Sequence, residues 1–194
     1  MNAAVILAAG ESTRMGFPKL LAEVKDKPLL QVIIDKVQPH FDELAVVLGS
    51  DNEVLSDNIN FYNSTILINE NWEEGIISSL RTALYYFQSI KEIKNLIVFL
   101  GDQPEVNEEV IKIFKETSED VLISQYRYKL NYPISIPRQY WSKLELLTND
   151  EETENITSDD DFDMIHYFVS SEINFKKVNF NFLGPTDYNE EKDF

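Results

Sequence analysis

The sequence predicts a single α/β domain built on a doubly wound, mostly parallel sheet with helices on both faces. Three observations support this prediction. Short unbroken apolar runs such as residues 3–9 are typical of parallel strands buried on both faces. These runs alternate with segments whose apolar residues recur at helical spacing, which is the pattern of βαβ units. The length of 194 residues and the hydrophobic content of 43% fit one domain with a sizeable core.

The first two thirds of the chain show the alternation most clearly. The expected strands are residues 3–9, 43–50, 64–69, 95–101 and 120–126. The expected helices are residues 28–37, 52–59, 75–90 and 108–117. The last third is less regular, with an extended segment at 132–137, helices at 138–147 and 162–170, and a strand at 174–180. The acidic residues from about 149 to 160 predict an exposed loop.

Charge and composition exclude several classes of partner. The formal net charge is −17, which repels the phosphate backbone of nucleic acids, so we expect no nucleic-acid partner. No apolar run approaches the roughly 20 residues of a transmembrane helix, so we expect no membrane partner and a cytoplasmic protein. The absence of cysteine excludes disulfides, thiolate zinc sites and cysteine nucleophiles. An anionic ligand would therefore need a local cluster of cations.

Such a cluster follows the first strand, in the stretch LAAGESTRMGFPKLL from Leu7 to Leu21. Its glycines, Gly10 and Gly16, allow a sharp turn whose backbone N–H groups can face an anion. Arg14 and Lys19 can add charge-assisted hydrogen bonds to phosphate. The stretch matches neither the Walker loop nor the Gly-x-Gly-x-x-Gly turn. These residues alone support a phosphate-binding loop and a tight strand-to-helix turn equally.

Two further stretches follow expected strands, at the sheet edge where open α/β sheets bind ligands. In GDQP, residues 101–104, Asp102 could bind Mg²⁺, which prefers carboxylate and phosphate oxygens, or could cap the following helix. In NENWEEGIISSL, residues 69–80, Ser78 and Ser79 could bond a nucleotide's sugar or base, or could cap the helix that begins there. Trp72 is of a type that packs more often than it stacks on a ligand.

In this order and spacing, the three stretches resemble the MobA/MocA-like nucleotidyltransferases, most closely the molybdenum cofactor cytidylyltransferase branch. The family's opening signature resembles L-A-A-G-x-S-x-R-M-G-x-P-K-L-L, and each fixed position is present from Leu7 to Leu21. Its middle signature, N-x-x-W-x-x-G-x-x-x-S-L, is matched from Asn69 to Leu80. Its metal signature, G-D-Q-P, is intact at 101–104. The resemblance covers roughly the first 105 residues, and the combination is more specific than any single glycine motif.

The resemblance implies a Rossmann-like fold that transfers a nucleoside monophosphate to a small phosphorylated acceptor and releases pyrophosphate. It implies CTP as the nucleotide, Mg²⁺ as the metal, a molybdopterin-type cofactor as the acceptor, and a molybdoenzyme as a possible recipient of the product. Residues of about 1–105 would bind the nucleotide and residues of about 106–194 the acceptor. The implied catalytic set is Arg14, Lys19 and Asp102, with Asp102 as the metal ligand. The implied nucleotide-binding set is Leu7, Ala8, Ala9, Gly10, Ser12, Arg14, Lys19, Ser78 and Ser79.

The last third departs from the family pattern. Residues 131–133 read Asn-Tyr-Pro where the family commonly has Gly-His-Pro. In the segment that resembles D-x-D-T-P-E-D, Asn181 and Leu183 stand where two carboxylates would be, and the second is expected to share the metal. The acidic run at 159–161 could substitute, although such runs more often form a solvated loop. Two alternatives therefore remain: transfer to a sugar phosphate or phospholactate, or a catalytically impaired relative that binds nucleotide or cofactor.

Overall fold

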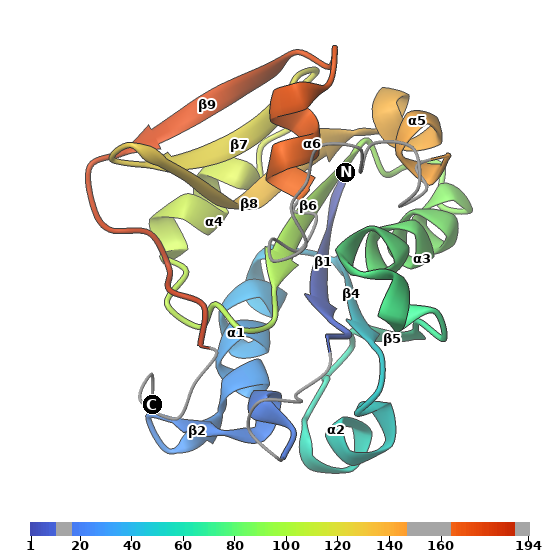
Figure 1. Cartoon of the computed structure of the whole chain (residues 1–194), viewed down its shortest axis with the longest axis vertical. Helices are drawn as coiled ribbons and strands as arrows, with labels where there is room; N and C mark the ends of the chain where they lie inside the picture. The colour runs from blue at the N-terminus through green and yellow to red at the C-terminus, as the bar shows by residue number, and fades with distance from the viewer. Residues whose placement is uncertain (11–16, 147–163, 189–194) are drawn as a thin grey trace.

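The computed structural model describes residues 1–10, 17–146 and 164–188. A seven-stranded sheet in the order β5-β4-β1-β6-β8-β7-β9 forms its centre, with helices on both faces (Figure 1). This arrangement confirms the predicted α/β class. The strands are β1 (Asn2–Ala8), β4 (Glu43–Leu48), β5 (Thr65–Ile68), β6 (Asn95–Leu100), β7 (Val121–Tyr126), β8 (Lys129–Pro137) and β9 (Phe175–Phe180).

The first half of the sheet is parallel throughout. β1 lies between β4 and β6, and β5 pairs with the outer side of β4. Every residue of β1 is buried, as its unbroken apolar sequence predicted. The helices that connect these strands begin and end close to the predicted positions: α1 (Leu29–Val37), α2 (Asn52–Asn58), α3 (Ile76–Gln88) and α4 (Glu108–Phe114).

The second half contains the main departure from a parallel sheet. β8 lies between β6 and β7 and runs antiparallel to both, whereas the sequence predicted only an extended segment at 132–137. The strand begins earlier because a tight turn, with Arg127 at a φ of 54°, folds β8 directly back onto β7. Such a short connection can join only antiparallel strands, since parallel pairing needs a long crossover.

Each face of the sheet carries its own hydrophobic core. On one face, α3, α5 (Trp141–Glu145) and α6 (Met164–Ser170) pack around Phe87 and Trp141. On the other face, α1, α2 and α4 pack around Ile33 and Phe114. A 3-10 turn, Arg138–Tyr140, precedes α5, so the predicted helix at 138–147 is shorter and less regular than expected. None of the helices in the described ranges is long and apolar enough to cross a membrane.

A small hairpin before α1 was not predicted. β2 (Glu23–Val24) pairs antiparallel with β3 (Lys27–Pro28) after a 3-10 turn at Lys19–Leu21. The two turn residues, Lys25 and Asp26, both have positive φ, 54° and 63°. Sequence patterns recognise such turns mainly by Asn-Gly or Asp-Gly, and this turn has neither.

Candidate active site

The first and third sequence motifs meet at the carboxyl ends of β1 and β6. Leu7 of β1 is in register with Leu100 of β6, and the Gly101 N–H donates to the Leu7 carbonyl oxygen at 2.8 Å. A Cβ atom at Gly101 would lie 3.0 Å from the Ala8 Cβ and 3.2 Å from the Leu7 oxygen. Any larger residue here would force a neighbour to shift, because the loop after β6 lies directly against the end of β1.

At this junction Lys19 and Asp102 form an ion pair, with 2.9 Å between Nζ and Oδ2. The two side chains are only 18% and 19% exposed. Burial raises the pKa of the Asp102 carboxyl, the ammonium of Lys19 counteracts this rise, and the negative charge of Asp187 adds to it. The structure thus brings together the residue predicted to bind phosphate and the residue predicted to bind metal.

The alternative role for Asp102, capping the next helix, is filled by another residue. Asn107 is the N-cap of α4, and its side-chain oxygen accepts a hydrogen bond from the Glu109 N–H at 2.8 Å. The Asp102 carboxylate is therefore available for a different purpose.

A second carboxylate near Asp102 comes from Asp187, which was not among the predicted ligands. The Tyr188 N–H donates to the Asp102 carbonyl oxygen at 3.2 Å, so the tail of the chain lies against the GDQP loop. The buried Gln103 amide donates to Asp187 Oδ1 at 2.7 Å and to Asn131 Oδ1 at 2.9 Å. Leu183, at the position where the family pattern suggested a carboxylate, is largely exposed.

The signals for Asp187 were present in the sequence but incomplete. Asp187 belongs to the segment that resembles D-x-D-T-P-E-D, and Gln103 belongs to GDQP. Asn131, in place of the family's glycine, donates to the Pro185 carbonyl oxygen at 3.1 Å. These residues lie far apart in the chain, so only the fold shows that they share one hydrogen-bond network.

Lys36 of α1 holds the same loop from its other side, and nothing in the sequence indicated this role. Its ammonium donates to the carbonyl oxygens of Pro104 at 2.5 Å and Val106 at 3.2 Å. Burial lowers the pKa of Lys36, and the charge of Lys25 lowers it further, while Glu105 and Glu108 raise it. Lys36 therefore fixes the backbone that follows Asp102.

The middle motif forms a joint between β5 and α3. The buried Asn69 amide donates to the hydroxyl oxygens of Ser78 at 2.7 Å and Ser79 at 3.0 Å. α3 begins after Gly75, whose φ of 85° suits glycine, and neither serine hydroxyl caps that helix. Trp72 is packed against the core on this side, in the packing role that its residue type suggested. Both predicted serines thus have a protein partner, and their contact with a nucleotide stays a prediction.

The remaining predicted residues divide between buried backbone and undescribed positions. Leu7, Ala8 and Ala9 are buried at the end of β1. Gly10 is exposed, and apart from its chain neighbours no atom of the described residues lies within 4 Å of the position that a Cβ would take there. Ser12, Arg14 and the acidic run at 159–161 lie outside the described residues.

The carboxylates at this site could hold Mg²⁺ together with oxygens of a substrate. Asp102 and Asp187 are both carboxylates, and within residues 1–10, 17–146 and 164–188 no group of three acidic, histidine or cysteine side chains could hold an ion. Protein-bound Mg²⁺ commonly uses one or two carboxylates, with substrate phosphates and water as the other ligands. The residues present therefore suit a metal that arrives with a phosphorylated substrate.

The sequence matches the MobA-like NTP transferase domain over residues 4–162. It is 32% identical over 111 residues to "Probable molybdenum cofactor guanylyltransferase" of Natranaerobius thermophilus, covering 56% of this chain and 51% of that protein. A protein with the same description from Aquifex aeolicus is 32% identical over 120 residues, covering 60% and 55%. The chain thus spans about half the length of the curated relatives it matches.

Solved structures extend the likeness to nearly the whole chain. Rv0371c of Mycobacterium tuberculosis superposes with a TM-score of 0.80 at 22% identity, covering 98% of this chain and 94% of that one. A manganese complex of Rv0371c superposes with a TM-score of 0.78 at 20% identity, with the same coverage. At these identities the likeness concerns the fold alone. Because the domain match includes the β1 loop, the Asn69 joint and the GDQP loop, the chain belongs to the MobA-like NTP transferase family.

Proposed function

We propose that the protein is a Mg²⁺-dependent nucleotidyltransferase that transfers CMP from CTP to a molybdopterin-type cofactor and releases pyrophosphate. The observation that carries the proposal is the Lys19–Asp102 ion pair at the junction of β1 and β6. A cation for phosphate and a carboxylate for metal are the two groups that such a transfer requires at one point. Without a bound substrate, each of them neutralises the other.

In this proposal the triphosphate takes the place of Asp102 as the partner of Lys19. Lys19 turns from Asp102 to the phosphates, where Arg14 joins it. The backbone of Leu7 to Gly10 receives the base and sugar, with Ser12 in the same loop. Ser78 and Ser79 border the nucleotide through the first turn of α3. Asp102 would hold Mg²⁺, with Asp187 beside it, and the metal would neutralise phosphate charge.

The chemical step needs no protein nucleophile. A terminal phosphate oxygen of the acceptor attacks the α-phosphorus of the nucleotide, and the bond from that phosphorus to the β-phosphate oxygen breaks. Lys19 and Arg14 balance the charge that accumulates on the departing pyrophosphate. The network of Gln103, Asn131 and Asp187 fixes the acceptor side of the loop, since it ties the GDQP segment to β8 and to the tail.

The proposal also names the nucleotide and the acceptor of the reaction. We propose CTP because the LAAG form of the opening motif resembles the cytidylyl branch of the family. The two curated relatives reported above are described as guanylyltransferases. A sugar phosphate or phospholactate is the alternative acceptor, and a molybdoenzyme is the expected recipient if the acceptor is a molybdopterin. The strongly acidic composition supports a small-molecule acceptor over nucleic acid. A cytoplasmic location is part of the proposal because the sequence has no long apolar run.

Pyrophosphate release from CTP and GTP, with Mg²⁺ and each acceptor, tests the proposal. We expect Asp102→Asn to lower kcat by roughly a hundredfold or more, as for other groups that stabilise transition-state charge. Asp57→Asn, an exposed carboxylate on α2, is the matched control and should leave turnover unchanged. Full activity of Asp102→Asn would contradict the metal assignment. CTP binding without turnover on any acceptor would identify a binding protein instead of an enzyme.

A further inference from the structure

β5 is an open edge of the central sheet. It pairs with β4 on one side, and the sheet order places no described strand on its other side. Proteins usually protect such edges with charged side chains, proline or a bulge. The sequence of β5 is Thr-Ile-Leu-Ile, and Ile66 and Ile68 are 39% and 46% exposed. Among the described residues β5 has no charge, proline or bulge, and its short length of four residues is its one evident protection.

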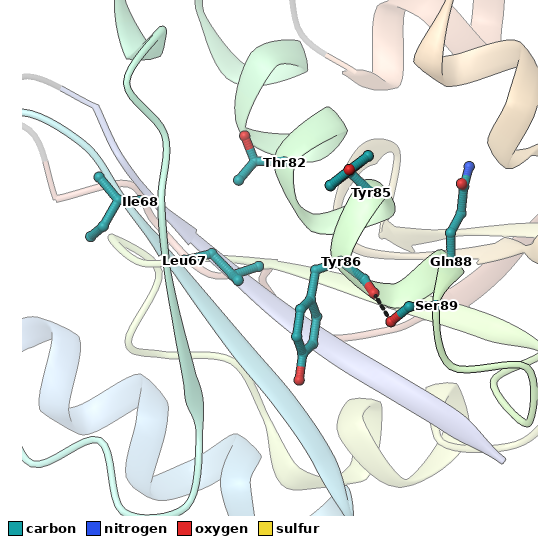
Figure 2. Close-up of a pocket in the computed structure, with 7 residues that line it drawn as sticks. All are labelled: Leu67, Ile68, Thr82, Tyr85, Tyr86, Gln88 and Ser89. Atoms are coloured by element: carbon teal, nitrogen blue, oxygen red, sulfur yellow. Dashed lines mark hydrogen bonds between the residues drawn. The ribbon is translucent and has the colours of Figure 1, made fainter.

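A groove lies between this edge and α3. Its volume is about 580 Å³, and Leu67 and Ile68 of β5 line it together with Tyr85, Tyr86 and Gln88 of α3. Figure 2 shows the two β5 side chains across from those of the helix. The hydroxyls of Thr65 and Tyr86 lie 3.1 Å apart and join strand to helix, while Tyr85 is 82% exposed. The edge, the groove and Tyr85 thus form one continuous surface.

The two segments that build this surface carry no charge of their own, although Arg138 and Glu145 contact Gln88 at its end. Residues 58–69 and 82–90 contain no charged side chain, although 26% of the whole chain is charged and its net charge is −17. Most of the molecule would repel a second copy of itself. A neutral face avoids that repulsion and offers no attraction for a charged partner. The charge distribution therefore favours self-association over capture of a basic or acidic segment.

We propose that β5 pairs antiparallel with β5 of a second copy, around a two-fold axis at Leu67. Directly opposed residues in antiparallel strands point to the same face, so this register places Ile66 of each copy opposite Ile68 of the other. The two sheets become continuous, and the two α3 helices lie side by side on one face. A strand of four residues buries too little for a stable dimer, which needs about 800 Å² per partner. Tyr85 and the groove supply the additional contact.

Sedimentation at increasing protein concentration tests this proposal without any need for activity. We expect a monomer–dimer equilibrium that shifts toward the dimer when salt rises from about 50 mM to about 500 mM, because salt screens the net repulsion. The double variant I66K/I68K should weaken dimerisation by roughly tenfold or more, because like charges would then face each other across the axis. Ile113→Lys on α4, also 39% exposed, is the matched control and should dimerise like the wild type. Circular dichroism and thermal unfolding check that each variant is folded.

A single cysteine tests the register. The natural chain has none, so Leu67→Cys introduces the one thiol of the protein. Opposed residues in antiparallel strands have Cα atoms about 4.5–5.5 Å apart, which is within disulfide range. Under mild oxidation we expect Leu67→Cys to form a covalent dimer much faster than Ile113→Cys. A monomer at every concentration, a dimer insensitive to I66K/I68K, or equal cross-linking of the two cysteine variants would overturn the proposal.

Discussion

Lys36→Met should loosen the loop that carries Asp102 while keeping an unbranched side chain of similar length. The substitution removes two hydrogen bonds from an ammonium, to the carbonyl oxygens of Pro104 and Val106. Hydrogen bonds to charged groups contribute about 1.5–3 kcal/mol each. Burial of the ammonium, which also lowers the pKa of Lys36, offsets part of that contribution. We therefore take about 2 kcal/mol as the net loss in the free energy of unfolding.

For a chain of this length, a loss of about 2 kcal/mol corresponds to a drop in Tm of about 4–8 °C. Differential scanning calorimetry measures that drop. Amide hydrogen exchange shows where the stability is lost. We expect the substitution to speed exchange more in residues 102–107 than in the strands. Lys112→Met is the control, because Lys112 is exposed and its ion pair with Glu108, at 3.4 Å, contributes less than about 1 kcal/mol. Equal Tm values for the two variants, with unchanged exchange after Asp102, would refute the assigned role of Lys36.

The other predictions concern the loop glycines and Asp187. Gly101→Ala should lower the free energy of unfolding by about 1–3 kcal/mol, because its Cβ would lie 3.0 Å from the Ala8 Cβ. Gly10→Ala should leave Tm unchanged and weaken CTP binding about tenfold. Calorimetric titration and thermal unfolding compare the two; a stable Gly10→Ala that binds CTP normally would contradict the nucleotide loop. Burial and the charge of Asp187 raise the pKa of Asp102 above 3.8 in the folded state. Between pH 3.8 and that raised pKa, folded Asp102 keeps a proton that the unfolded chain has released. The free energy of unfolding therefore falls as pH rises through this interval. Asp187→Asn should reduce this fall, as measured by urea unfolding between about pH 3.5 and 7. An identical pH profile for the wild type and Asp187→Asn would show that the two carboxylates do not interact.

Local patterns in the sequence predicted most of the elements but not their order in the sheet. Strands and helices depend on residues near each other in the chain, so hydrophobic periodicity located β1, β4, β6 and α3 closely. The place of β8 depends on a turn at Arg127 that no common turn residue marks. In the candidate site, too, local motifs were predictable and the contacts between them were not. Lys19 and Asp102 belong to recognisable motifs, and the fold brings them within 2.9 Å of each other.

The residues that the sequence did not identify act over long separations. Lys36 donates to the carbonyl oxygens of Pro104 and Val106. Every residue has a backbone carbonyl, so the sequence does not show which ones will accept a hydrogen bond. Asp187 reaches the GDQP loop through Gln103, and the family-like segment that contains Asp187 does not by itself indicate this contact across the fold. Tertiary contacts of this kind need the whole fold before they can be found.

The position of β8 has a consequence for how the protein can be divided. The three family motifs all lie before residue 105, yet the strand that completes hydrogen bonding along β6 comes from residues 129–137. In a fragment that ends near residue 105, the apolar β6 would become an unpaired edge strand. Gln103 would also lose its hydrogen bonds to Asn131 and Asp187. Such an edge invites aggregation. Residues 129–137 and the segment around Asp187 are therefore folding partners of the first 105 residues, and the two parts form one structural unit.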